Sequence, residues 1–171
     1  MFRMILPAEG VEAPPERPIA RVEAVSSPGG RPGGRRFGTL VHAILRDLDL
    51  RGTPGQITAL ARVHARMLGA PPEEANAAAA AVEAAWSHPL VARARTAERC
   101  HRELPVNLRL EDGRLVEGVI DLAFLEDGAW VVVDFKSEAL APARYERQVQ
   151  WYLHALSKLT GRPAGGYLLR I

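Results

Sequence analysis

The chain has 171 residues, of which 47% are hydrophobic and 25% are charged, a composition typical of one soluble globular domain. It has no run of about 18 apolar residues and only one cysteine, which excludes a membrane-spanning helix and an internal disulfide framework. The net charge of +2 is weak evidence for a nucleic-acid footprint, and because no secretion signal begins the chain, we expect a cytoplasmic protein.

The first 36 residues are predicted to form a flexible arm. They hold six prolines and five glycines and end in SSPGGRPGGRR, a composition that cannot supply a packed core. They also carry six arginines and four glutamates, whereas the rest of the chain has equal numbers of basic and acidic residues. The basic excess therefore lies in this arm, which is either a plain flexible lead-in or an arginine-rich segment that touches DNA.

Helical segments follow the arm. Apolar side chains recur at helical spacing over Gly38–Leu48, where Thr39 is placed to cap the first turn. A second helix is predicted over Gln56–Leu68, and an alanine-rich third helix over Pro72–Trp86 begins with a proline and two glutamates. A shorter helix is expected over Leu90–Ala97.

From residue 101 onward the hydrophobic period changes from helical to two. Arg102–Leu110, Leu115–Leu125 and Ala129–Lys136 are predicted strands, separated by Asp-Gly pairs that favour tight turns. An amphipathic helix is predicted over Ala141–Leu159, followed by a last strand over Gly166–Ile171.

This order predicts an α/β fold for residues 37–171 as a single domain. Residues 37–99 form an N-terminal helical part, and residues 100–171 form a core made of a three-strand meander, a long helix and a final strand. Because that strand returns across a helix, it should run parallel to its neighbour, which makes the sheet mixed.

Two carboxylates and a lysine mark the second and third strands of the meander. Asp134 and Lys136 interrupt a strand that is otherwise apolar on both faces, and a buried charge needs a partner. If the hairpin register brings Asp121 beside Asp134, the two carboxylates repel each other, and a divalent cation such as Mg²⁺ would relieve the repulsion. Lys136 is one of two lysines among 22 basic residues. The alternative is an ordinary Asp–Lys ion pair at the end of a strand.

Other polar residues fit either a functional or a structural role. His42 in its apolar helix is either a metal ligand or a hydrogen-bonded core histidine. Glu103 taken alone is best explained as a solvated strand residue. Tyr145, Gln148 and Tyr152 share one stripe of the long helix, which is more often core, although a buried amide needs hydrogen-bond partners.

Five segments together resemble, in order, the motifs of the PD-(D/E)XK nucleases, specifically the RecB/AddA-type nuclease domain at the C-terminal end of helicase–nuclease chains. The segments are GTLVHAIL (38–45), RELPV (102–106), EGVIDLAF (117–124), WVVVDFKS (130–137) and YERQVQWYLHAL (145–156). Each is weak alone, and GVIDL followed by VDFKS is the most specific part. The resemblance implies a restriction-endonuclease-like core.

The resemblance also implies roles for individual residues. The metal ligands would be His42, Asp121, Asp134 and the backbone carbonyl of Phe135. Lys136 would position or activate the attacking water, Gln148 and Tyr152 would line the catalytic site, and Glu103 would have an accessory role.

The implied activity is hydrolysis of DNA phosphodiester bonds that depends on Mg²⁺ or Mn²⁺. The implied enzyme is an exonuclease that acts on single-stranded ends and works beside a helicase in recombination and repair. A channel for a single strand should combine arginines with aromatic rings, and the candidates are Arg144, Tyr145, Arg147 and Trp151. The chain has no Walker motif for ATP and too few cysteines for the iron–sulfur cluster of the AddB-like branch. The alternative function is a catalytically silent nuclease-fold module that binds DNA or a helicase partner.

Overall fold

The computed structural model describes residues 3–4, 14, 20–25, 32–137 and 142–171 of the chain. In chain order the elements are β1 (Arg3–Met4), β2 (Ala20–Ala24), α1 (Arg35–Asp47), α2 (Pro54–Leu68), α3 (Pro72–Trp86), α4 (Pro89–Thr96), β3 (Arg99–Arg109), β4 (Leu115–Glu126), β5 (Ala129–Lys136), α5 (Pro142–Thr160) and β6 (Ala164–Arg170). They form two compact units. One holds α5 and most of the sheet, and the other holds α1–α4 with the last residues of β5 and β6.

The first unit is built on a mixed sheet with the strand order β1-β4-β5-β6-β2, in which β3 pairs with β4. β3 and β4 pair antiparallel from Arg99 opposite Leu125 to Arg109 opposite Leu115, with a break in the ladder at Glu103 and Asp121. β4 and β5 pair antiparallel over residues 122–126 and 129–133. The predicted α/β fold with a three-strand meander, a long helix and a returning strand is confirmed.

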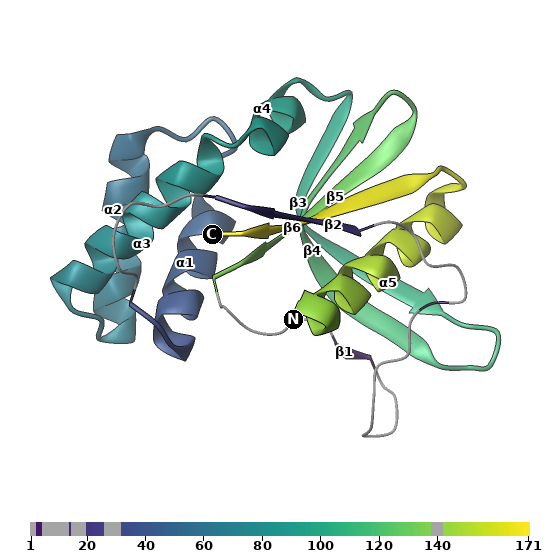
Figure 1. Ribbon diagram of the computed structural model, residues 1–171, viewed down its shortest axis with the longest axis horizontal. Helices are drawn as coiled ribbons and strands as arrows, with labels where there is room; N and C mark the ends of the chain where they lie inside the picture. Colours follow the sequence, from purple (N-terminus) through teal and green to yellow (C-terminus); the bar gives the residue numbers. More distant parts are fainter. Residues whose placement is uncertain (1–2, 5–13, 15–19, 26–31, 138–141) are drawn as a thin grey trace. The chain divides into compact units, whose positions relative to one another are not determined.

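Helix α5 packs against β3 and β4 and closes the core of this unit, and Figure 1 shows it as the green helix beside the strands. Val149, Tyr152 and Leu153 of α5 belong to one buried apolar cluster with side chains from β3, β4, β5 and β6. The packing is tight enough to require a glycine on β6. A β-carbon at Gly166 would lie 2.7 Å from Cγ1 of Val149.

Two short strands lie within the segment predicted as a flexible arm, so that prediction does not hold for their residues. In β1, Arg3 pairs with Glu117 and Met4 pairs with Val116. β5 pairs with β4 over residues 122–126, and β1 supplies hydrogen-bond partners to β4 farther along the strand, where backbone groups otherwise need water. β2 adds a strand beside β6.

In the second unit, α1, α2 and α3 pack against one another, as Figure 1 shows. The starts of α1 and α2 differ from the prediction by more than one residue. α1 begins at Arg35, and the Thr39 hydroxyl donates a hydrogen bond of 2.9 Å to the Arg35 carbonyl inside the helix, so its predicted capping role is wrong. α2 begins at Pro54, earlier than predicted, because Thr53 and Gln56 form a reciprocal capping box. Within the described residues, no helix combines the length and apolarity that crossing a membrane requires.

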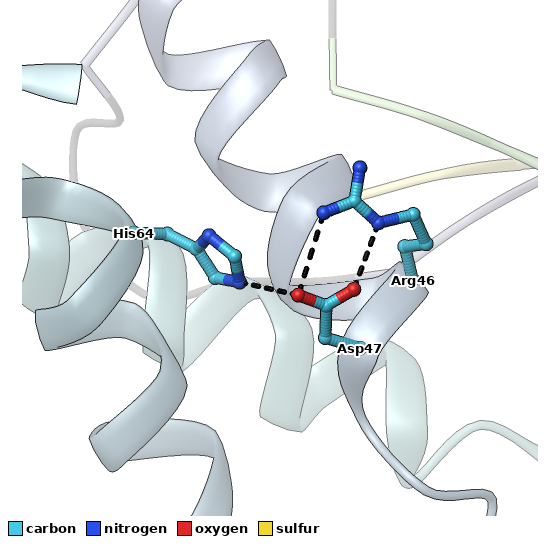
Figure 2. A network of polar contacts seen from close by, with 3 residues as sticks. All are labelled: Arg46, Asp47 and His64. Carbon is cyan, nitrogen blue, oxygen red and sulfur yellow. Dashed lines mark hydrogen bonds and ion pairs between the residues drawn. The ribbon is translucent and has the colours of Figure 1, made fainter. Parts of the chain in front are cut away.

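A polar network ties the end of α1 to α2 (Figure 2). The Asp47 carboxylate accepts a 2.8 Å hydrogen bond from Nε of Arg46 and lies 2.9 Å from Nε2 of His64, a buried residue of α2. The hydrogen bond from Arg46, together with the nearby charges of Arg46 and His64, holds the pKa of the Asp47 carboxyl below its ordinary value of 3.8, although burial acts in the opposite direction.

Asp47→Asn is expected to lower stability at neutral pH by less than about 1 kcal/mol, because the ion pair is solvent-exposed. A lowered pKa means that the folded chain favours the ionised carboxylate. The stabilisation is therefore complete above pH 3.8 and is lost as the pH falls through the lowered value. Thermal melts of wild type and Asp47→Asn across this range should converge in acid. A difference that persists unchanged in acid would contradict the ionic origin.

Candidate active site

The two predicted carboxylates lie just beyond the paired end of the β4–β5 hairpin. Leu122 pairs with Val133 at the end of the ladder, and Asp121 and Asp134 are the next residue of each strand beyond that last pair. The charges of both carboxylates act on the buried hydroxyl of Tyr152 in α5, so both lie near it. Asp134 is 1% exposed and Asp121 is half-buried. Both carboxylates therefore stand at the same end of the hairpin, and their joint hold on a cation stays a prediction.

Tyr152 of α5 faces this pair. Its hydroxyl oxygen accepts a 3.0 Å hydrogen bond from Nε2 of Gln148 and another from the backbone N–H of Val119. Burial raises the pKa of the Tyr152 phenol far above its usual range, and the charges of Asp134 and Asp121 raise it further, against the two hydrogen bonds. Both carboxylates therefore act on one buried hydroxyl. The Val119 contact comes from the backbone, and no side-chain pattern in the sequence indicated it.

The donor set of this pair suits a hard divalent cation. Two adjacent carboxylates repel each other, and Oδ2 of Asp134 is a buried oxygen that accepts no hydrogen bond from the described residues, although Asp134 makes other polar contacts. In the described part of the chain, no three His, Cys, Asp or Glu side chains gather as a metal-binding cluster. One or two carboxylates with retained water is the arrangement that Mg²⁺ uses. The pair therefore fits Mg²⁺ or Mn²⁺.

Lys136 stands two residues after Asp134 on β5, so strand alternation directs the two side chains to the same face. Lys136 is half-buried, and its carbonyl accepts a 2.9 Å hydrogen bond from the N–H of Ile171. The Phe135 side chain between them is 2% exposed, and its backbone carbonyl remains a predicted metal ligand. The residues that follow Asp134 on β5 group with the helical unit.

His42 lies on α1 in that same unit, and it is half-buried. A β-carbon at Gly38 would lie 2.9 Å from the Ser137 hydroxyl oxygen, so this side of α1 approaches the end of β5 closely. His42 is four residues after Gly38, which places both on one helix face. That face is turned toward the segment that carries Lys136. The role of His42 as a ligand remains a prediction.

Glu103 lies on β3 at the register position opposite Asp121, between the pairs Arg102–Leu122 and Leu104–Ile120. Its side chain is exposed, and its backbone φ of 49° is left-handed. The family resemblance singled out the Glu103 carboxylate, but nothing in the sequence predicted its left-handed backbone.

Some of the candidate DNA-contact residues of α5 lie at the surface, and others lie in the core. Arg144 and Arg147 are exposed, and Tyr145 is half-buried against the apolar cluster. Trp151 is 1% exposed and meets the His154 ring edge-on at 5.7 Å. Trp151 is therefore a core residue of the helix, because residues 151–156 of α5 are all buried.

Comparison with known proteins identifies the family to which the sequence is similar. The sequence profile of the PD-(D/E)XK nuclease superfamily matches residues 19–171. A protein of Alkaliphilus oremlandii, whose name describes an ATP-dependent helicase/nuclease subunit, is 28% identical over 148 residues, which are 73% of this chain and 12% of that protein. The Geobacillus kaustophilus protein of the same name is 29% identical over 160 residues, 74% of this chain and 13% of that protein. The chain thus matches about an eighth of the length of these relatives.

Tyr152→Phe is expected to destabilise the fold by about 1–3 kcal/mol, because it leaves the Gln148 amide and the Val119 N–H without their buried acceptor. Chemical denaturation measures the loss. Tyr167→Phe, at a half-buried tyrosine of β6, is the matched control and should cost much less. Equal losses in the two variants would contradict the hydrogen-bonded role of the Tyr152 hydroxyl.

Proposed function

Because the chain belongs to the PD-(D/E)XK nuclease superfamily, we propose that it is a metal-dependent deoxyribonuclease that hydrolyses phosphodiester bonds. The observation that supports the proposal is that Asp121 and Asp134 follow the last β4–β5 pair and both act on the buried Tyr152 hydroxyl, with Lys136 two residues after Asp134 on β5. Two carboxylates and one ammonium on one face of a sheet are the groups that phosphoryl chemistry with a hard cation requires.

The residues that would hold Mg²⁺ or Mn²⁺ are Asp121, Asp134, the carbonyl of Phe135 and His42. A bound cation would supply Lewis-acid chemistry, acidifying a water and offsetting charge on the scissile phosphate. The carboxylates contribute two fixed negative charges, one of them nearly inaccessible to solvent. Burial keeps their repulsion strong, so the pair favours a cation over two separately solvated charges.

Lys136 would bring positive charge to the phosphate as negative charge develops on it. An ammonium is a compact charge that can hold a phosphate oxygen or a water, whereas arginine acts as a planar fork. Tyr152, held by Gln148 and by the Val119 N–H, would form the wall of the site behind the carboxylates. Because the Tyr152 hydroxyl is buried and accepts two hydrogen bonds, it would stay fixed beside the carboxylates.

The proposed substrate is single-stranded DNA, cut from an end. Arg144 and Arg147 are exposed in the first turns of α5, and Tyr145 lies between them in the sequence. Exposed arginines with an aromatic neighbour suit the phosphates and bases of a single strand. Relatives whose names describe helicase/nuclease subunits support a helicase as the proposed partner, which would supply unwound ends during recombination and repair.

Asp134→Asn and Lys136→Met are each expected to lower cleavage of end-labelled single-stranded DNA by at least about 100-fold, the scale of losing one preorganised electrostatic group. Purified chain would be incubated with Mg²⁺, with Mn²⁺ or with EDTA, and product lengths would be read on a gel. EDTA should abolish cleavage, and circular single-stranded DNA should resist it if cutting starts from ends.

Matched controls are Asp112→Asn, in the β3–β4 turn, and Lys158→Met, at an exposed lysine near the end of α5. Both should cut like wild type. A folded wild type that binds DNA but does not cut it with either metal, alone or with a helicase, would replace the proposal with the catalytically silent binding module.

A further inference from the structure

Strand β4 changes the face that it buries beneath α5. Ile120 and Ala123 both belong to the apolar cluster that contains the α5 side chains, yet they stand three positions apart. Side chains alternate along a strand, so residues an odd number of positions apart point to opposite faces of a regular strand. Leu125 accompanies Ala123 in the cluster, and Val106 of β3 accompanies Ile120. The β3–β4 ribbon therefore turns over between Ile120 and Ala123.

The turn-over coincides with Glu103 and Asp121. The pairing continues in the same register on both sides, from Arg102–Leu122 to Leu104–Ile120. No residue is therefore inserted, as it would be in a β-bulge. The irregular element is the backbone of Glu103, whose φ of 49° lies in the left-handed region that a residue with a β-carbon adopts at a cost.

We propose that Glu103 is a positioning residue, whose left-handed backbone turns the ribbon and directs Asp121 toward the Tyr152 hydroxyl on which Asp134 also acts. The inference deepens the proposed function, because it explains how the metal-binding pair is assembled. The Glu103 side chain is exposed, which agrees with a role for the backbone conformation rather than for the carboxylate. Backbone strain that is retained beside a functional carboxylate is a recognised way to orient it.

Substitutions at this position separate the backbone from the side chain. Glu103→Gly removes the carboxylate and accepts a left-handed φ without a steric penalty. Glu103→Gln removes the charge and keeps the side-chain shape. Glu103→Val is β-branched, and such residues are outliers at positive φ. Glu103→Thr is a milder β-branched variant, which serves if the valine variant does not fold.

The test uses the full chain and two readouts besides activity. The first is hydrogen exchange of the Val119 amide, which donates to Tyr152 and lies two residues from Asp121. The second is Mn²⁺ affinity by calorimetry. In Glu103→Val we expect Val119 exchange to accelerate and Mn²⁺ affinity to fall, each by at least about tenfold. In Glu103→Gly and Glu103→Gln both should stay within about threefold of wild type.

The chain offers a matched control at Asp127, a second non-glycine residue with a left-handed φ, 50°, in the β4–β5 turn. Asp127→Val should reduce thermal stability while leaving Val119 exchange within about threefold. The proposal is overturned if Glu103→Val or Glu103→Thr matches wild type, or if Glu103→Gly and Glu103→Gln lose as much as Glu103→Val. A wild type that binds no Mn²⁺ would refute the metal site alone, since Val119 exchange still decides the role of Glu103.

Discussion

The placement of two like charges around one buried hydroxyl is the constraint on which the rest of the site depends. Asp134 is almost fully buried, and its charge and that of Asp121 both act on Tyr152, so the fold holds two carboxylates where they repel each other. Such a pair persists because its strands are fixed by buried apolar neighbours on both faces of β5 and by the pairing of β4 with β3. Helix α5 then supplies a buried tyrosine with two hydrogen-bond donors behind the pair.

Arginine and lysine side chains have different roles in this chain. Arginines make structural contacts: Arg36 lies 2.7 Å from the buried Glu74, and Arg95 donates to the carbonyls of Leu50 and Trp86 at 2.9 and 2.8 Å. Their planar, always charged heads suit such multiple contacts. A lysine stands where the proposed chemistry needs a compact charge beside a carboxylate. That contrast supports a functional interpretation of Lys136.

The parts of the fold that depend on local pattern could be predicted from sequence. The bounds of α3 and β5 agree with the prediction, because a proline start, alternating apolar residues and Asp-Gly turns mark them directly. The antiparallel β4–β5 hairpin could also be predicted, because the Asp-Gly turn fixes where its strands meet. Three features could not be predicted: the left-handed backbone of Glu103, the short strand β1 and the burial of Trp151. Each depends on contacts or pairing with a segment that is distant in the sequence.

The central claim is that the hairpin carboxylates together hold a divalent cation, and a crystal of the chain grown with Mn²⁺ tests it most directly. The anomalous difference map should show one peak within about 2 Å of carboxylate oxygens from both Asp121 and Asp134. A peak bound elsewhere, or none at Mn²⁺ concentrations that support DNA cleavage, would contradict the account.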